Sequence, residues 1–323
     1  MFLKYINEPI LYQGRNKCRK YFEGWYFKHI SNDLKNTICI IPGITKDECD
    51  PHAFVQTIIN RNIGDELRVT THYYRYSIND FKYTDVPFSI KIGENMFASN
   101  GIELTLEDDE FSISGKINYS SFTKIKTNII YPNIMGCFAY LPIMECYHGI
   151  VSMNHYLDGS LFLNEEEINF NEGKGYIEKD WGTSFPKEYV WMQCNHFKDK
   201  DASIMCSIAD IPFLGTSFQG FICNLSFSGR EYRFASYNNS KILNINCSYN
   251  MFEVTIVKGN LKLEINAKMD KGGVLKAPQY GTMKRTIKEG VNGVISLKLA
   301  KKNNEILYVG EGKPCGIEIV KNS

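Results

Sequence analysis

Two acidic residues separated by one position stand in the aromatic-rich stretch GYIEKDWGTSFPKEYVWMQCNHF (175–197). On a β-strand, Glu178 and Asp180 project from the same face because side chains alternate with a period of two. A nearby carboxyl group and apolar burial both oppose the ionisation of a carboxylic acid. The pair therefore predicts a general acid that keeps its proton near neutral pH. The alternative is an ordinary ion pair with a neighbouring lysine such as Lys179.

Aromatic side chains accompany these acids. All three tryptophans of the chain fall in two short segments, 21–30 and 173–197. Because the face of an aromatic ring attracts positive charge, the segments predict a site where protonation creates a cation on a substrate. The aromatic candidates for substrate contact are Trp25, Tyr26, Trp181, Tyr189 and Trp191.

Polar candidates lie among these rings. Gln193 and Asn195 share a strand face with Trp191, and a plain apolar core avoids amides because each needs hydrogen-bond partners. We expect a pocket with apolar walls and a few fixed polar groups, in which these amides or His148 bind the polar head of a substrate. In the alternative, the amides face solvent, the other strand face forms the core, and His148 is structural. Glu23 is a further pocket candidate or a carboxylate bonded to backbone amides.

Several kinds of site are excluded by spacing. The six histidines form no H-x-H or HExxH motif, and the ten cysteines are scattered singly without a CxxC pair. We therefore expect no metal site and free, mostly buried cysteines. The nucleotide motifs GxGxxG and GxxxxGK[ST] and the hydrolase motif GxSxG are absent as well, so no cofactor is expected.

The elements that carry these residues have the period of β-strands. The segment 251–269 shows it most clearly, with two alternating runs joined by a Lys-Gly-Asn turn. Similar runs recur at intervals of about 8–12 residues, which is typical of barrels and sandwiches. The expected fold is all-β, with two lipocalin-like antiparallel β-barrel or sandwich domains. Helix is expected only over 283–290 and 78–83.

The chain length of 323 residues favours two domains. The stretch NFNEGKG (169–175) offers glycines and polar residues for a linker, so we expect an N-terminal domain over 1–170 and a C-terminal domain over 171–323. Thirty-seven Lys and Arg against 36 Asp and Glu give a net charge of +1, which disfavours nucleic acid as a partner. No signal peptide or apolar span is visible, so we expect a cytoplasmic protein without membrane insertion. The abundance of Asn, Lys and Ile suggests a bacterial source.

Four segments carry a resemblance to a known family. YFEGWYFK (21–28), CYHGIVSMNHYLDGSL (146–161), the stretch 175–197 and GVLKAP (273–278) resemble segments of the tocopherol cyclase family, in the same order along the chain. The resemblance implies a lipocalin-related fold and, in plant members, closure of a chromanol ring on a prenylated quinol. Where the plant motif generally has asparagine, this chain has Asp180.

Two functions follow as hypotheses. The first is an enzyme, an isomerase or lyase that cyclises or hydrates a prenylated quinol or a related isoprenoid lipid by proton transfer. The second is a lipocalin-like carrier that binds a hydrophobic small molecule without changing it, since the fold alone does not distinguish the two.

Overall fold

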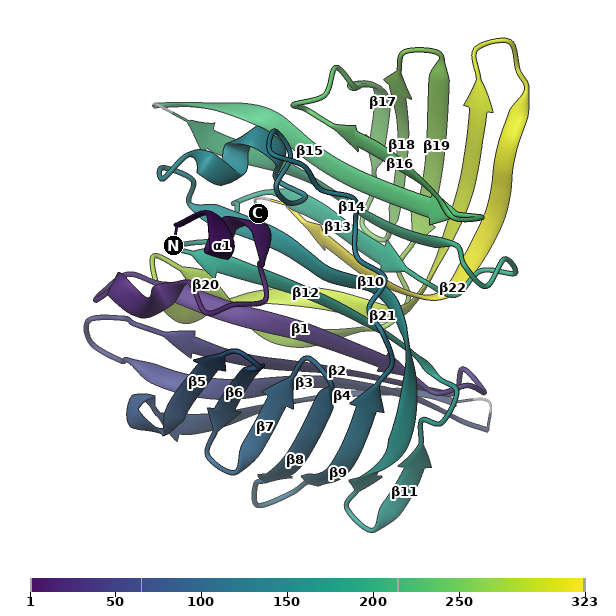
Figure 1. Ribbon diagram of the computed structural model, residues 1–323. Coiled ribbons are helices and arrows are strands. Elements are labelled where there is room, and N and C mark those ends of the chain that lie inside the picture. The colour runs from purple at the N-terminus through teal and green to yellow at the C-terminus, as the bar shows by residue number, and fades with distance from the viewer. Residues whose placement is uncertain (1, 65, 214, 322–323) are drawn as a thin grey trace. The chain divides into compact units, whose positions relative to one another are not determined.

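The computed structural model describes residues 2–64, 66–213 and 215–321, which fold into two large antiparallel sheets (Figure 1). Helix in this part of the chain is confined to α1 (Phe2–Asn7) and three short 3₁₀ turns at Gly14–Asn16, Ile78–Asp80 and Gly136–Tyr140. The predicted all-β class is confirmed. None of the helices among these residues has the length and apolar character needed to cross a membrane.

The first sheet has twelve strands, in the order β4-β3-β2-β1-β12-β10-β9-β8-β7-β6-β5, with β11 paired to β10. Its strands are β1 (Phe22–Ile30), β2 (Asn36–Thr45), β3 (His52–Ile63), β4 (Glu66–Ser77), β5 (Phe81–Asp85), β6 (Phe88–Ile92), β7 (Asn95–Ala98), β8 (Gly101–Glu107), β9 (Ser112–Tyr119), β10 (Cys146–Leu163), β11 (Glu166–Asn169) and β12 (Lys174–Gly182).

The second sheet has ten strands, in the order β16-β15-β14-β13-β22-β21-β19-β18-β17, with β20 paired to β21. Its strands are β13 (Tyr189–Cys194), β14 (Ser203–Phe213), β15 (Thr216–Phe227), β16 (Arg230–Ala235), β17 (Lys241–Cys247), β18 (Met251–Lys258), β19 (Leu261–Lys268), β20 (Gly272–Gln279), β21 (Thr282–Lys301) and β22 (Ile306–Val320).

Each sheet encloses its own apolar core. In the first, inward side chains from nearly every strand form one cluster that includes Trp25, Phe27 and Ile177. In the second, Val190, Met192 and Cys194 of β13 belong to the corresponding cluster. The period-two alternation of the sequence thus places one face of each strand in a core, as expected for sheets that curve around their own side chains.

The chain divides into two compact units. The first comprises residues 1–133, 145–185 and 275–286, and the second comprises 134–144, 186–274 and 287–323. The expected linker at 169–175 is a tight turn inside the first unit, where Gly173 N–H donates to the Phe170 carbonyl and Glu172 has a φ of 61°. Beyond this turn, β12 pairs with β1 and β10. The chain passes from the first unit into the second at 185/186, fifteen residues beyond the expected boundary at 170/171.

The two expected helices differ from the structure. Residues 283–290 lie within the long strand β21, and of 78–83 only the first three residues form a 3₁₀ turn, which leads into β5. Pairing of β21 with β20, and of its Glu289 and Gly290 with β22, outweighs the local preference of a short segment, because most helix stability comes from tertiary packing.

Candidate functional site

The site lies in the first unit, where β10 and β12 run side by side. Their antiparallel register sets His148 opposite Asp180 and Ile150 opposite Glu178. On β12, Ile177 faces the core, so Glu178 and Asp180 project from the other face of the sheet. We call this face, turned away from the core of the first unit, the outer face. The prediction that the two acids share a face is confirmed.

His148 joins the two carboxylates. Its Nδ1 lies 2.8 Å from Asp180 Oδ1 in a hydrogen bond, and its Nε2 lies 3.4 Å from Glu178 Oε2. The second contact is an ion pair and not a hydrogen bond, and Nε2 is buried without a hydrogen-bond partner among the described residues. Nε2 therefore lies near the Glu178 carboxylate, but a proton on Nε2 makes no hydrogen bond.

Tyr176 extends this cluster by one residue. Its hydroxyl donates to Glu178 Oε2 at 2.5 Å, and the tyrosine is fully buried. Burial and the charge of Glu178 raise the pKa of Tyr176 well above its usual value, so the phenol remains a donor. Tyr176 fixes the carboxylate oxygen that faces His148.

The electrostatics favour a protonated imidazole. Burial lowers the pKa of His148, but the charges of Asp180 and Glu178 and the hydrogen bond to Asp180 raise it by more, to about 9. The His148 side chain is 11% exposed and that of Asp180 24%, so water screens the pair only in part. Near neutral pH, His148 is therefore a protonated imidazolium that lies between the Glu178 and Asp180 side chains.

This geometry adds a second candidate for the proton donor. The sequence suggested a carboxylic acid, and the structure places His148 between Glu178 and Asp180. His148, Glu178 and Asp180 each offer one atom of a type that binds metal ions, and these atoms lie within 4.8 Å of one another. The cluster thus has the geometry of a cation site as well as that of a site for proton transfer.

Sequence reasoning missed Tyr176. The signal was present, because Tyr176, Glu178 and Asp180 alternate along a single strand and so share a face. His148 was expected only as a partner for a substrate head, since nothing in the sequence fixes the register between β10 and β12.

Tyr26 lies next to the cluster on the outer face. It is the register partner of Glu178 across β1 and β12, is 8% exposed, and its hydroxyl lies 3.0 Å from Cys39 Sγ. The structure thus brings one aromatic candidate beside the acids.

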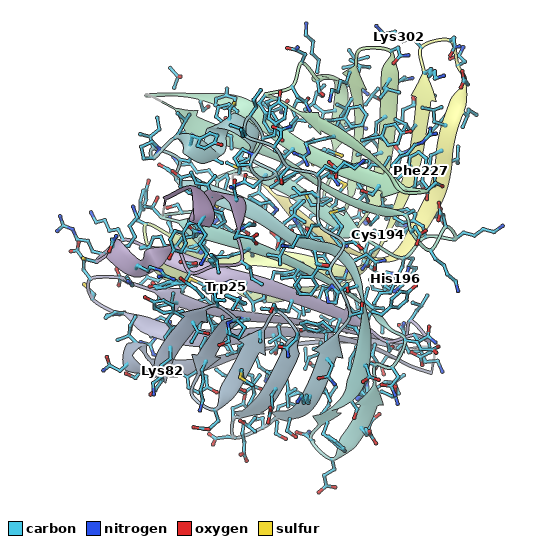
Figure 2. The ribbon with its side chains drawn as sticks, viewed as in Figure 1. Trp25, Lys82, Cys194, His196, Phe227 and Lys302 are labelled. Carbon is cyan, nitrogen blue, oxygen red and sulfur yellow. The ribbon has the colours of Figure 1, made fainter. Side chains whose placement is uncertain are left out.

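Glu23 and Trp25 project from the opposite face of β1. Glu23 accepts the backbone N–H groups of Gln13 and Gly14 at 2.8–2.9 Å and forms a buried ion pair with Lys179. Trp25, which is labelled in Figure 2, is fully buried in the core. Its ring lies near those of Phe81 of β5 and Phe88 of β6. For Glu23 the geometry matches the structural alternative, and both residues lie across the sheet from His148.

Lys179 completes this structural group. Its ammonium lies 4.6 Å from the Trp25 ring and 4.9 Å from the Trp181 ring. Burial lowers the pKa of Lys179 to about 8, although Glu23 opposes the shift. Trp181 stacks on Tyr147, with the ring centroids 5.6 Å apart. Trp181 is thus held by a ring and a cation on the core-facing side of β12.

The remaining candidates belong to the second unit. Tyr189, Trp191 and Gln193 are buried on the face of β13 opposite its core residues. Asn195, which directly follows β13, is buried as well. Tyr189 donates to Glu318 Oε2 at 2.5 Å. The other strand face forms the core, as in the alternative, but the amides do not face solvent.

Two pockets in the described part of the chain lie away from His148. One of about 170 Å³ in the first unit is lined by polar groups that include Asp50, His52 and Arg75. One of about 810 Å³ in the second unit is lined largely by polar side chains such as Glu253 and Glu264. Their linings differ from the apolar pocket that the sequence suggested.

Comparison with known proteins first defines a class. Over 93% of both chains, the structure matches a candidate AttH from Nitrosomonas europaea at 12% identity with a TM-score of 0.54. It matches kievitone hydratase from Nectria haematococca over 97% of this chain and 94% of that one, at 12% identity with a TM-score of 0.53. It also matches CghA at 6% identity with a TM-score of 0.51, over 93% of this chain and 88% of that one. These likenesses define a shared lipocalin-like fold.

The sequence comparison then gives the family. A profile described as tocopherol cyclase-like matches residues 110–320, and the chain belongs to this family. A probable chloroplastic tocopherol cyclase from Oryza sativa subsp. japonica is 24% identical over 184 residues, and the chloroplastic tocopherol cyclase of Zea mays is 28% identical over 74. The matches cover 55% and 23% of this chain but only 38% and 16% of the rice and maize proteins.

Proposed function

We propose that the protein is an acid–base catalyst that closes a ring on, or adds water to, a lipophilic unsaturated substrate such as a prenylated quinol. The observation that carries the proposal is the buried His148 between Asp180 and Glu178. Membership of the tocopherol cyclase-like family supports the substrate class.

The energetics of the cluster favour catalysis over simple carriage. Withdrawing charged groups from water costs several kcal/mol for each ion, of which their mutual attraction recovers only part. A carrier of an apolar lipid gains nothing from an imidazolium and two carboxylates. The buried pair of Glu23 and Lys179 also holds charges at such a cost, but both its side chains are sealed from solvent. The side chains of His148 and Asp180 stay 11% and 24% exposed, and charged groups with a shifted pKa that a substrate can reach are typical of catalytic sites.

The reaction is balanced without a cofactor. His148 Nε2–H donates its proton to one alkene carbon of the substrate, and the other carbon forms a bond to a phenol or water oxygen. That oxygen loses its proton to Glu178. Because Glu178 Oε2 lies 3.4 Å from Nε2, the proton returns to His148 and the site ends as it began.

Protonation of the alkene and formation of the carbon–oxygen bond take place in one concerted step. An imidazolium with a pKa of about 9 is too weak an acid to form a free tertiary cation by proton transfer alone. Bond formation to oxygen must therefore accompany protonation. Asp180 keeps Nδ1 protonated and sets the ring orientation, while Tyr176 holds Glu178 as the acceptor. General acid–base catalysis of this kind contributes about 10²–10⁴-fold.

Variants of the cluster test this proposal. His148→Gln and Glu178→Gln should each lower turnover of a prenylated quinol by at least about 100-fold, while binding of the quinol, followed by native mass spectrometry, persists. Wild-type protein that retains the quinol stoichiometrically and never converts it would contradict catalysis and favour the carrier.

A further inference from the structure

Gly24 interrupts the side-chain pattern of the outer face in the middle of the first sheet. It is the register partner of Asp180 on β12 and of Gly43 on β2. A glycine within a strand weakens the strand because it adds backbone entropy and packs no side chain. Its presence beside the acid therefore requires a reason.

Neither backbone nor packing supplies that reason. Gly24 is not among the glycines with positive φ. A Cβ at this position would lie 3.8 Å from Ile41 Cγ2 and 3.9 Å from the Pro42 carbonyl oxygen, which is ordinary van der Waals contact. Gly24 is also half-buried, not sealed. The fold would accept a side chain that the sequence does not place there.

Gly43 differs from Gly24 in this respect. A Cβ at Gly43 would lie 2.3 Å from Phe54 Cζ, so the ring of Phe54 occupies the space above it. Phe54 and Gly43 are register partners on β3 and β2. Along this row of the sheet, Gly24 therefore stands between Asp180 and the Phe54 ring.

The Phe54 ring is held in place. It stacks on Tyr73 with the centroids 5.2 Å apart and the planes at 18°, and Lys276 Nζ lies 4.0 Å from the Tyr73 centroid. Gln56 fixes the backbone of Lys276 by accepting its N–H at 2.7 Å and donating to its carbonyl at 3.2 Å. The segment GVLKAP, which the proposed chemistry does not use, thus supports this wall.

We propose that Gly24 is the specificity-determining position at which the unsaturated group of the substrate lies against the sheet, between the His148–Asp180 pair and the Phe54 ring. Neighbouring strands are about 4.8 Å apart, so a flat group over Gly24 has Asp180 one strand away and His148, the proton donor, two strands away on the same side. On the other side, the ring of Phe54 stabilises the positive charge that develops on carbon. The inference rests on the proposed function and adds a size limit for the reacting group.

Substitution at Gly24 tests the inference. Gly24→Val should fold with a Tm equal to or above the wild-type value, because valine favours strands. Its kcat/KM for a prenylated quinol should fall at least 100-fold, and that of Gly24→Ala about tenfold. Thr105→Val, which adds the same side chain at an exposed position of β8, should leave kcat/KM unchanged.

Further measurements distinguish a failure of this inference from a failure of the proposed function. A quinol whose alkene carries no methyl branch should lose less with Gly24→Val than the quinol with the branched alkene does, since the size of the unsaturated group is the variable. Wild-type activity in both Gly24 variants would overturn the inference while leaving the proposed function intact. Absence of wild-type turnover would overturn the proposed function itself. If Gly24→Val fails to fold, a folded Gly24→Ala with unchanged kcat/KM for both quinols is decisive against the inference.

Discussion

His148 Nδ1 and Asp180 Oδ1 lie 2.8 Å apart as register partners on neighbouring antiparallel strands. Two backbone ladders therefore fix both ends of this hydrogen bond, and no flexible loop carries either residue. A site built on strands keeps its geometry when a substrate arrives. The hydrogen bond to Asp180 orients the imidazole ring, and in the proposed mechanism Nε2 is the atom that donates the proton.

The pKa of His148 depends on its carboxylate partners. Asp180→Asn removes one of the charges that raise the pKa to about 9, so the midpoint of the imidazole titration should move clearly downward. NMR of the ring protons measures this midpoint, with His148→Gln assigning the resonance. An unchanged midpoint in Asp180→Asn would contradict the coupling.

Stability should depend on pH through the same residue. The pKa of His148 is about 9 in the folded protein against an ordinary value of 6.5, so the contribution of this residue to stability is fully present below about pH 6.5 and is lost as the pH rises to 9. At 1.36 kcal/mol per pKa unit, the shift of about 2.5 corresponds to roughly 3 kcal/mol at most. The free energy of unfolding from urea titrations at pH 6 and pH 9.5 should fall in the wild type and fall less in His148→Gln. If the free energy of unfolding fell equally in the wild type and in His148→Gln, the raised pKa of His148 would be refuted.

Tyr176 should act as a positioning residue. Tyr176→Phe keeps the ring but leaves Glu178 Oε2 without the phenol donor, a loss that costs about 1–3 kcal/mol for a buried group. We expect kcat to fall about tenfold or more with KM little changed, together with a shift in the alkaline limb of the pH–rate profile. A variant that lost stability alone, with kcat and the pH profile intact, would show Tyr176 to be merely structural.

The buried pair of Glu23 and Lys179 should contribute to folding and not to chemistry. Lys179→Met leaves the Glu23 carboxylate buried without its cation, and breaking such a pair typically costs about 3–5 kcal/mol. Combining Lys179→Met with Glu23→Gln should recover part of this loss, as measured by chemical denaturation. If the single variant were as stable as the wild type, the pairing would be wrong.

The sequence predicts the fold better than the site. Alternation in segments such as 251–269 is a local property, so it indicates strands and an all-β class directly. The register between β10 and β12 depends on contacts between residues some thirty positions apart, and no local pattern reveals it. For this reason Glu178 and Asp180 were found, whereas the central place of His148 and the role of Tyr176 were not.

Residue type alone was a weak guide to which face of a strand is used. Trp25 and Glu23 look like site residues because they are aromatic and acidic, yet they project into the core side of β1. Tyr26, one position further on, faces the cluster. A shift of one residue moves a side chain to the other face of the sheet.

The most direct test of the account follows the proton into the product. Wild-type protein supplied with a prenylated quinol in D₂O should release a cyclised or hydrated product with one solvent deuterium on the former alkene carbon, and His148→Gln should form that product at least about 100-fold more slowly while still binding the quinol. Product formation by His148→Gln at the wild-type rate, or recovery of only unchanged quinol from the wild type, would contradict the proposed role of His148.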